Sequence, residues 1–372
     1  MEINLLVGSG ISIPSKVFDV KQITEKLLTG KWAIQNNKYV EIKDEVHRND
    51  PKILSLQKLL RYIQEEYSND SNLLNYEELF YVIDCLNKFN SFPEENFIYK
   101  NEYDHFKNHF NLTLKPYELY DFTRVFNDIF KYFQSTISHL LEKYGVIKGL
   151  KLFDEIYEAN EISTCNIFTL NHDLLLEKYF TDKNYEYNTG FNEIDGDVNL
   201  FNFKSLKSGK PDFRIIKLHG SINWYSFPQE FGPYKQTKYG IATDDLNKLK
   251  NKDGEKYEPQ FDFPHFLSGT HNKIIDYSNS TFFELRNYFF SKHEEIDNTI
   301  VSGYGWRDEG INKVFYNWLN TCKSNKLHLL YNNLKNETGF RDFEFYKLRD
   351  QVIDYGVYLE DTKWKDIRKN MC

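Results

Sequence analysis

The chain has 372 residues, of which 40% are hydrophobic, 27% charged and 17% aromatic, and its formal net charge is −8. This composition is too apolar for a disordered protein, and the acidic balance excludes the strong basic bias of a general nucleic-acid binder. The aromatic share comes from 31 Phe, 27 Tyr and 5 Trp. These rings are candidates for platforms on which bases stack, but the parallel abundance of Ile, Asn and Lys favours codon bias in an AT-rich genome.

Hydropathy and cysteine spacing exclude several further classes of protein. No apolar run approaches the roughly 18 residues needed to span a bilayer, and the apolar stretch of residues 3–7 is too short for a secretory signal. The cysteines form no Cys-x-x-Cys pair, so their spacing predicts neither a disulfide framework nor a zinc site. They stand at Cys85, Cys165, Cys322 and Cys372. We therefore expect a soluble, cytoplasmic protein without a bound metal or a direct nucleic-acid partner.

The first part of the chain predicts one buried strand followed by helices. Residues 3–7 form the strand, and a helix is expected to begin near Asp19. Asp50 before Pro51 is a good helix start, and Asn75 with Glu78 suggests a capping box. Further helices are expected around residues 118–145 and 149–159. These patterns predict a helical insertion domain over residues 31–160.

The pattern changes after residue 160. Short apolar strands are predicted at residues 166–170, 214–218, 299–302 and 326–331. Helices are predicted over residues 173–180 and 309–319, and residues 228–280 are expected to form an irregular insertion. Strands that alternate with helices in this way predict an α/β fold, with a Rossmann-like parallel sheet flanked by helices. Residues 1–30 and 161–372 are expected to form this domain together.

Polar or glycine-rich segments follow the predicted strands. In an open parallel sheet, ligands bind beyond the carboxyl ends of the strands, where glycines let backbone amides approach a pyrophosphate. A Gly-Ser-Gly segment also suits an ordinary tight turn, and a single histidine is often packed in a core, so only the conjunction indicates a dinucleotide site. The segments are Gly8-Ser9-Gly10-Ile11-Ser12, Asn171-His172-Asp173, His219-Gly220, Gly303-Tyr304-Gly305 and Asn332.

These segments resemble the motifs of the sirtuin family. Residues 8–12 look like the sirtuin Gly-Ala-Gly-Ile-Ser loop, and residues 169–173 resemble its Thr-Gln-Asn-x-Asp segment. Residues 218–220 are similar to the strand end that carries the catalytic histidine, and residues 303–305 to the Gly-Thr-Ser loop. The motif sequences are most similar to those of a bacterial sirtuin-like branch of anti-phage defence. Its members commonly contain Thr-Leu-Asn-x-Asp, Leu-His-Gly-Ser-x-x-Trp and Gly-Tyr-Ser-x-x-Asp, which correspond to residues 169–173, 218–224 and 303–308 here.

Several departures separate the chain from the protein deacylases of that family. The zinc-binding cysteine pairs are missing, Leu170 replaces a glutamine, and the segment after the glycine loop is reduced to Ile13-Pro14-Ser15 without its arginine. These differences weaken the argument for a deacylase function, but they do not affect the motifs expected to form the dinucleotide pocket. The resemblance therefore implies that NAD is the substrate and that its nicotinamide–ribose bond is hydrolysed.

The resemblance also implies roles for individual residues. Asn171 would orient ribose hydroxyls or water, His219 would act as general base, and Asp173 would hold local geometry or favour the cationic intermediate, besides capping the next helix. Asp308 matches the Gly-Tyr-Ser-x-x-Asp motif and so looks functional, but an acidic residue that opens a helix is more often a cap. The expected NAD-binding set consists of Gly8, Ser9, Gly10, Ser12, Gly303, Tyr304, Gly305 and Asn332.

Three functions stay open from the sequence. The first is an NAD+ glycohydrolase that releases nicotinamide and ADP-ribose and acts as an abortive-infection effector by NAD depletion. Relatives of this kind are often controlled by homo-oligomerisation or by a partner such as a HerA-type ATPase or a short Argonaute. The second is a non-catalytic sensor of NAD or ADP-ribose, and the third is an NAD-dependent protein deacylase.

Overall fold

The computed structural model describes residues 1–35, 38–42, 50–68, 73–91, 94, 97–113, 122–208, 212–231, 234–266, 280–331 and 350–371. These residues divide into two compact units. The first comprises Met1–Val17 and the described residues from Tyr144 onward, and the second comprises the described residues of Phe18–Lys143. Both bounds differ from the predicted 31–160, because the helix that starts near Asp19 belongs to the second unit and the residues after Tyr144 belong to the first.

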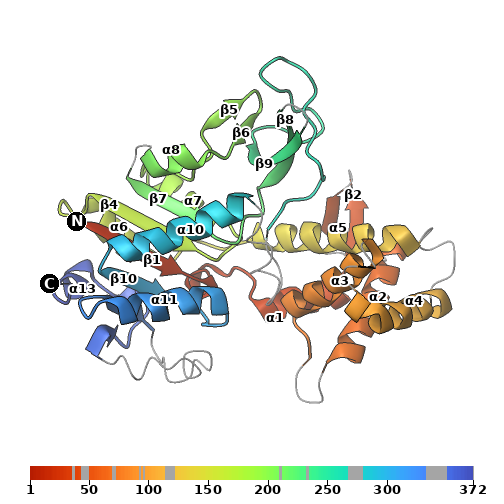
Figure 1. Cartoon of the computed structure of the whole chain (residues 1–372), viewed down its shortest axis with the longest axis horizontal. Helices are drawn as coiled ribbons and strands as arrows, with labels where there is room; N and C mark the ends of the chain where they lie inside the picture. Colours follow the sequence, from red (N-terminus) through yellow and green to blue (C-terminus); the bar gives the residue numbers. More distant parts are fainter. Residues whose placement is uncertain are drawn as a thin grey trace. The chain divides into compact units, whose positions relative to one another are not determined.

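A six-stranded parallel sheet forms the centre of the first unit (Figure 1). Its order is β12-β11-β10-β1-β4-β7, and each neighbouring pair runs parallel, which confirms the predicted α/β fold. The strands are β1 (Glu2–Val7), β4 (Thr164–Thr169), β7 (Phe213–Lys217), β10 (Asn298–Ser302), β11 (Lys326–Leu330) and β12 (Val352–Asp354).

Helices cover both faces of this sheet. Leu5 and Ile167 face a core that contains residues of α6, α7 and α13, whereas Leu6 and Phe168 face a core built with α10 and α11. The alternation of side chains along each strand divides the apolar residues between the two faces. The helices of this unit are α6 (Lys151–Glu158), α7 (Leu175–Asp182), α8 (Phe203–Ser208), α10 (Ser280–Glu295), α11 (Glu309–Thr321) and α13 (Trp364–Arg368).

The strand order reverses direction at β1. From β1 the chain continues to β4 and β7 on one side, and it later returns to β10, β11 and β12 on the other side. The strands β1 and β10 are therefore parallel neighbours whose following connections run to opposite sides of the sheet. Such a switch point is where open α/β sheets bind their ligands, in the crevice beyond the carboxyl ends of the strands.

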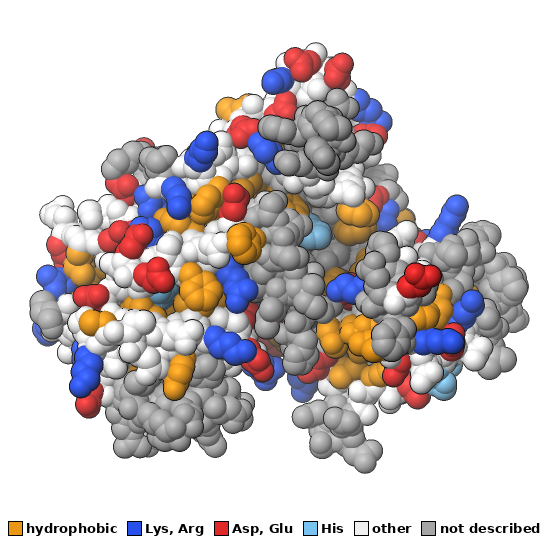
Figure 2. Space-filling view, in the orientation of Figure 1, with side chains coloured by type: hydrophobic (Ala, Val, Ile, Leu, Met, Phe, Trp, Pro, Cys, Tyr) orange, Lys and Arg blue, Asp and Glu red, His pale blue; other side chains and the backbone are white. Residues whose placement is uncertain are grey.

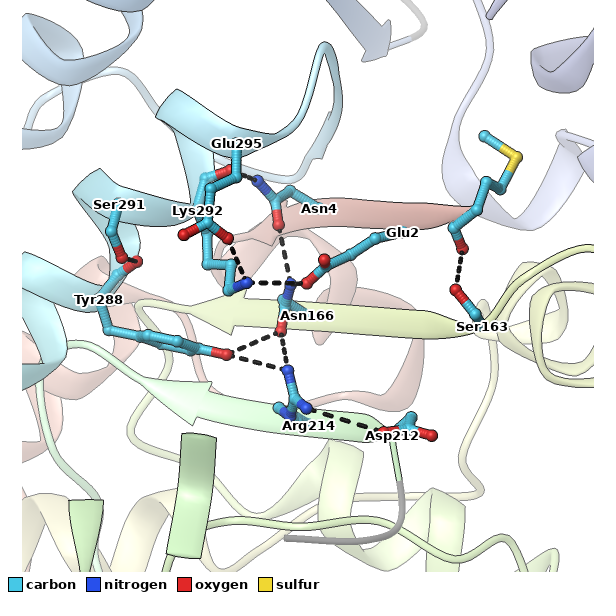
Figure 3. Close-up of polar contacts among 11 residues, drawn as sticks. Glu2, Asn4, Ser163, Asn166, Asp212, Arg214, Tyr288, Ser291, Lys292 and Glu295 are labelled. Atoms are coloured by element: carbon cyan, nitrogen blue, oxygen red, sulfur yellow. Dashed lines mark hydrogen bonds and ion pairs between the residues drawn. The ribbon is translucent and has the colours of Figure 1, made fainter. Parts of the chain in front are cut away.

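A buried row of polar side chains crosses the α10 face of the sheet. The row consists of four residues in register on neighbouring strands, Thr299, Asn4, Asn166 and Arg214. Asn166 donates to Asn4 Oδ1 at 3.1 Å, and Arg214 donates to Asn166 Oδ1 at 3.3 Å (Figure 3).

The same row anchors α10. Arg214 donates to the Tyr288 hydroxyl at 3.0 Å, and Asn4 donates to the carbonyl of Lys292 at 3.0 Å. Lys292 also pairs with Glu2 at 3.2 Å (Figure 3). Since the Asn4, Arg214 and Tyr288 side chains are buried, their bonds avoid unsatisfied polar atoms and fix the helix over one register of the sheet. The chain leaves α10 directly into β10 and then into the loop after it, so the row also fixes the start of that loop.

Within residues 228–280, positions 228–231 and 234–242 form regular strands, which corrects the expected irregular insertion over this part. Strands β8 and β9 form an antiparallel hairpin, and β9 pairs with β6 in a second, four-stranded sheet of order β5-β6-β9-β8. This sheet packs on a small core that contains Val198, Phe227 and Leu249. Its strands are β5 (Glu193–Asp195), β6 (Val198–Leu200), β8 (Tyr225–Phe231) and β9 (Tyr234–Ala242).

The second unit is mainly helical. Asp50 caps α2 by accepting from Lys52 N at 2.8 Å, and Asn75 and Glu78 form the expected capping box. A two-stranded hairpin packs beside α5. The elements of the second unit are α1 (Val20–Thr29), β2 (Trp32–Gln35), β3 (Lys38–Glu41), α2 (Pro51–Tyr67), α3 (Tyr76–Ser91), α4 (Lys100–Thr113) and α5 (Phe122–Leu141). No helix in the described ranges combines the length and apolar character that crossing a bilayer requires.

Two buried histidines predict acid sensitivity of the first unit. His293 on α10 is 2% exposed and His328 on β11 is fully buried, and burial lowers the pKa of each to about 4. The unfolded chain binds protons at these residues from about pH 6.5 downward, whereas the folded chain does not, so stability is present above that pH and lost toward pH 4. Each histidine is expected to remove about 2 kcal/mol from the free energy of unfolding between pH 7 and 5.

Urea unfolding of the wild type and of a His293→Gln/His328→Gln variant at pH 7 and pH 5 measures this effect. The variant is expected to lose less stability than the wild type between the two pH values. An equal loss in both proteins would show that other groups cause the acid sensitivity.

Candidate functional site

Four of the predicted segments meet at one edge of the parallel sheet. Because β1, β4, β7 and β10 are parallel neighbours, the residues that follow their carboxyl ends share that edge. The segments are 8–12 after β1, 171–173 after β4, 219–220 after β7 and 303–308 after β10. The first and the last of them flank the switch point between β1 and β10. Asn332 lies outside the described residues, so its place at this edge stays a prediction.

The glycines at the switch point let two loops pack backbone against backbone. A Cβ atom on Gly8 would lie 2.5 Å from Gly303 O, and one on Gly10 would lie 2.6 Å from Gly303 Cα. Gly303 itself has φ +64°, which favours glycine. The amides of Gly8 and Gly10 donate to the carbonyls of Ser302 and Gly303 at 3.0 and 2.9 Å. The glycines therefore join the ends of β1 and β10. The single amide protons of Gly8 and Gly10 are used in these bonds, and contact of the loop with a phosphate stays a prediction.

Asn171 and Asp173 are bonded to the glycine loop through Ser12. The Ser12 hydroxyl donates to Asp173 Oδ2 at 3.0 Å and accepts from Asn171 Nδ2 at 3.1 Å, and the same Nδ2 donates to Gly8 O at 3.2 Å. All three side chains are buried. Both amide protons of Asn171 are used in this way, which leaves its Oδ1 as the acceptor that can orient a hydroxyl or a water.

Asp173 also bonds to the start of α7, although the N-cap residue of this helix is Leu174 and not Asp173 as predicted. Its Oδ1 accepts from Leu175 N at 2.9 Å, at the start of α7. One carboxylate thus holds the helix with one oxygen and the Ser12 hydroxyl with the other. This bond pattern fixes the position of residues 171–173 relative to the glycine loop.

A buried lysine that the sequence analysis did not identify also bonds to the segment of residues 171–173. Lys217 ends β7, and its ammonium donates to the carbonyls of Asn171, at 3.3 Å, and Asp173. It also pairs with Glu177 of α7 at 3.2 Å. Burial raises the pKa of Glu177 although the Lys217 charge opposes this. The signal in the sequence was a lysine in the last position of a strand whose other residues, apart from Arg214, are apolar.

His219, which follows β7, contacts Asp308 at the start of α11. Its Nε2 is 3.0 Å from Asp308 Oδ2, and the exposed fractions of the two side chains are 3% and 8%. Asp308 is also the N-cap of α11, as predicted, because its Oδ1 accepts from Ile311 N at 3.1 Å. The cap interpretation was correct but incomplete. His172 is a further neighbour, with its ring centre 6.3 Å from that of His219.

Tyr304 and Gly305 differ in their surroundings. Tyr304 is buried, and its hydroxyl lies 2.7 Å from Asn312 Oδ1, so it stabilises its own loop. Gly305 is exposed, and no described atom lies within 4 Å of the position of an added Cβ. Ser9 is exposed at the tip of the glycine loop. Contact of these three residues with NAD stays a prediction.

The site combines three chemical capacities. The Asn171 Oδ1 accepts hydrogen bonds, the His219 imidazole accepts and releases protons, and the Asp308 carboxylate stabilises a charged imidazolium. Together they suit a reaction in which a water or hydroxyl is oriented and deprotonated. Within the described ranges no three His, Cys, Asp or Glu side chains are grouped to hold a metal ion, and a metal-free site stays a prediction.

Acidic and basic side chains alternate over the described surface in the view of Figure 2. They do not gather there into one continuous basic field of the kind that follows a nucleic-acid backbone. No protein-family model matches the chain, and no curated protein matches it either.

Proposed function

We propose that this chain is an NAD+ glycohydrolase that releases nicotinamide and ADP-ribose. The observation that carries the proposal is that Asn171 and His219 follow the neighbouring strands β4 and β7, with Asn171 bonded to the glycine loop and His219 to Asp308 after β10. An amide oxygen and an imidazole in this place suit a bound dinucleotide. The sirtuin-like order of the four segments supports NAD as the substrate.

The proposed reaction uses the side chains of Asn171, His219 and Asp308. The nicotinamide of NAD is a cationic leaving group, so the C1′–N bond breaks with its electron pair going to the ring nitrogen and without a general acid. Water then forms the new bond to C1′. Asn171 Oδ1 accepts a hydrogen bond from that water and orients it, and His219 takes its proton. The Asp308 carboxylate stabilises the imidazolium that results.

The biological role follows from the same resemblance. Hydrolysis of NAD without a second substrate depletes the cellular pool, which suits an effector of anti-phage abortive infection. Such an activity has to be restrained until infection. We therefore propose control by homo-oligomerisation or by a defence partner such as a HerA-type ATPase, with the helical unit of Phe18–Lys143 as the surface for this control.

Product analysis tests the proposed reaction. The purified chain is incubated with NAD, with and without an acyl-lysine peptide, and nicotinamide and ADP-ribose are separated by chromatography. We expect both products without peptide, and no turnover in a His219→Ala variant. The reaction is repeated with the proteins encoded beside the gene, to supply any activator.

The other two functions give different results in this experiment. Nicotinamide release only in the presence of the peptide would identify a deacylase. Tight NAD binding without turnover, under every condition and with every partner, would identify a sensor. Either result would overturn the proposed hydrolysis.

A further inference from the structure

The carboxylate of Asp308 is held at both of its oxygens. Oδ1 accepts from Ile311 N at 3.1 Å in the first turn of α11, and Oδ2 lies 3.0 Å from His219 Nε2. The two side chains are almost completely buried. A cap residue that also contacts a proposed general base, 89 residues away in the chain, is more than a cap.

The loop that presents Asp308 is itself fixed by the first turn of α11. Asn312 donates to Trp306 O at 2.8 Å and accepts from the Tyr304 hydroxyl at 2.7 Å. The amide of Tyr304 donates to the Tyr331 hydroxyl at 3.0 Å. Trp306 has φ +58°, a conformation that costs energy outside glycine and persists only where its surroundings determine it. The helix and its loop therefore present Asp308 in one position.

This geometry assigns a tautomer to His219. A carboxylate only accepts hydrogen bonds, so Nε2 carries the proton and Nδ1 is the basic nitrogen of the neutral ring. We propose that Asp308 is a positioning residue that sets the tautomer and the orientation of His219. The inference rests on the proposed function for its catalytic meaning, but the tautomer itself does not depend on turnover.

Asparagine at position 308 is the most informative substitution. Asn caps helices about as well as Asp, and the cap requires its oxygen at Ile311 N. The amide nitrogen must then face His219 and donate to Nε2, which moves the ring proton to Nδ1. Asp308→Asn is therefore expected to keep the helix start and reverse the tautomer.

Nitrogen-15 NMR of the full chain with labelled histidines reads the tautomer directly. The His219 signal is assigned by its loss in a His219→Gln variant. We expect an Nε2-protonated ring in the wild type and an Nδ1-protonated ring in Asp308→Asn. An Nδ1-protonated ring in the wild type, or the same tautomer in both proteins, would overturn the proposal. The measurement needs no substrate, so it decides the proposal even if the chain does not hydrolyse NAD.

Kinetics then test the catalytic meaning. Asp308→Asn is expected to lower kcat for nicotinamide release about 100-fold and to leave KM nearly unchanged. Asp19→Asn is the matched control, because Asp19 caps α1 by accepting from Gln22 N at 2.8 Å and lies in the other unit. This control is expected to retain full turnover. Turnover of Asp308→Asn within about twofold of the wild type would overturn the positioning role.

Discussion

Replacement of Asn171 by alanine is expected to reduce nicotinamide release from NAD about 1000-fold, close to the loss caused by removing a preorganised group from a transition state. The amide of Asn171 is held by Gly8 O and by the Ser12 hydroxyl, so its Oδ1 has one direction. Alanine removes this acceptor, so in the proposed reaction the attacking water would lose its orientation. Chromatography of nicotinamide over time, at saturating NAD, measures the effect.

A matched control separates this loss from a loss of folding. Asn188 is also buried, and its side chain also bonds to backbone groups, donating to Ser205 O at 3.0 Å and accepting from Gly190 N at 2.8 Å. Asn188→Ala is expected to lower the unfolding temperature while retaining turnover. If Asn171→Ala retains more than a tenth of wild-type turnover, Asn171 is not part of the catalytic machinery.

Replacement of Lys217 by methionine is expected to lower the free energy of unfolding by about 3 kcal/mol, the usual cost of removing one partner of a buried ion pair. The ammonium of Lys217 is 3% exposed at the side chain and is paired with Glu177. Methionine fills a similar volume but leaves the Glu177 carboxylate buried without its counter-charge. It also leaves the carbonyls of Asn171 and Asp173 without their donor. Urea unfolding at pH 7 measures the loss.

A double variant isolates the charge effect. Lys217→Met combined with Glu177→Gln removes both charges, so it is expected to recover at least about 1 kcal/mol relative to Lys217→Met alone. Complete recovery is not expected, because the two carbonyls still lack a donor. A single variant as stable as the wild type, or a double variant less stable than the single one, would show that the pair does not stabilise the segment after β4.

The sequence predicted the central sheet because its strands are buried on both faces. Such strands appear as mainly apolar runs, and five of them, at residues 3–7, 166–170, 214–218, 299–302 and 326–331, correspond to β1, β4, β7, β10 and β11. The edge strand β12 has three residues, which is too short for a pattern. The polar row at Asn4, Asn166 and Arg214 was not apparent, because its partners come from different strands and from α10.

The hairpin of β8 and β9 was missed for a different reason. Pro228 and a run of polar residues interrupt the alternation that marks a half-buried strand. The two strands are nevertheless separated by only two residues, Gly232 and Pro233, and such a short spacer between strand-like runs is a hairpin signal.

The contact of His219 with Asp308 is beyond the reach of sequence patterns. The capping role of Asp308 is local and was predicted, whereas its contact with His219 depends on how α11 packs against the sheet. Gly303 is a similar case, because a side chain at this position would collide with Gly10, which follows the neighbouring strand β1. Local chemistry could be predicted at these positions, but long-range pairing could not.

The aromatic content also has a simpler explanation than base stacking. Phe168, Phe289 and Trp318 are buried in the core under α10 and α11, and Trp224 packs against Phe282 in the same core. Large rings fill the space between the sheet and its helices. The described aromatic residues that lie near the proposed site, such as Tyr304, are buried as well.

A crystal structure of the His219→Ala variant with bound NAD tests the central claim most directly, because we expect this variant to bind NAD without converting it. We predict that the nicotinamide ribose lies against Asn171 Oδ1 and that the diphosphate lies beside residues 8–12, at the switch point between β1 and β10. NAD bound elsewhere on the chain, or no bound NAD at saturating concentration, would contradict the account.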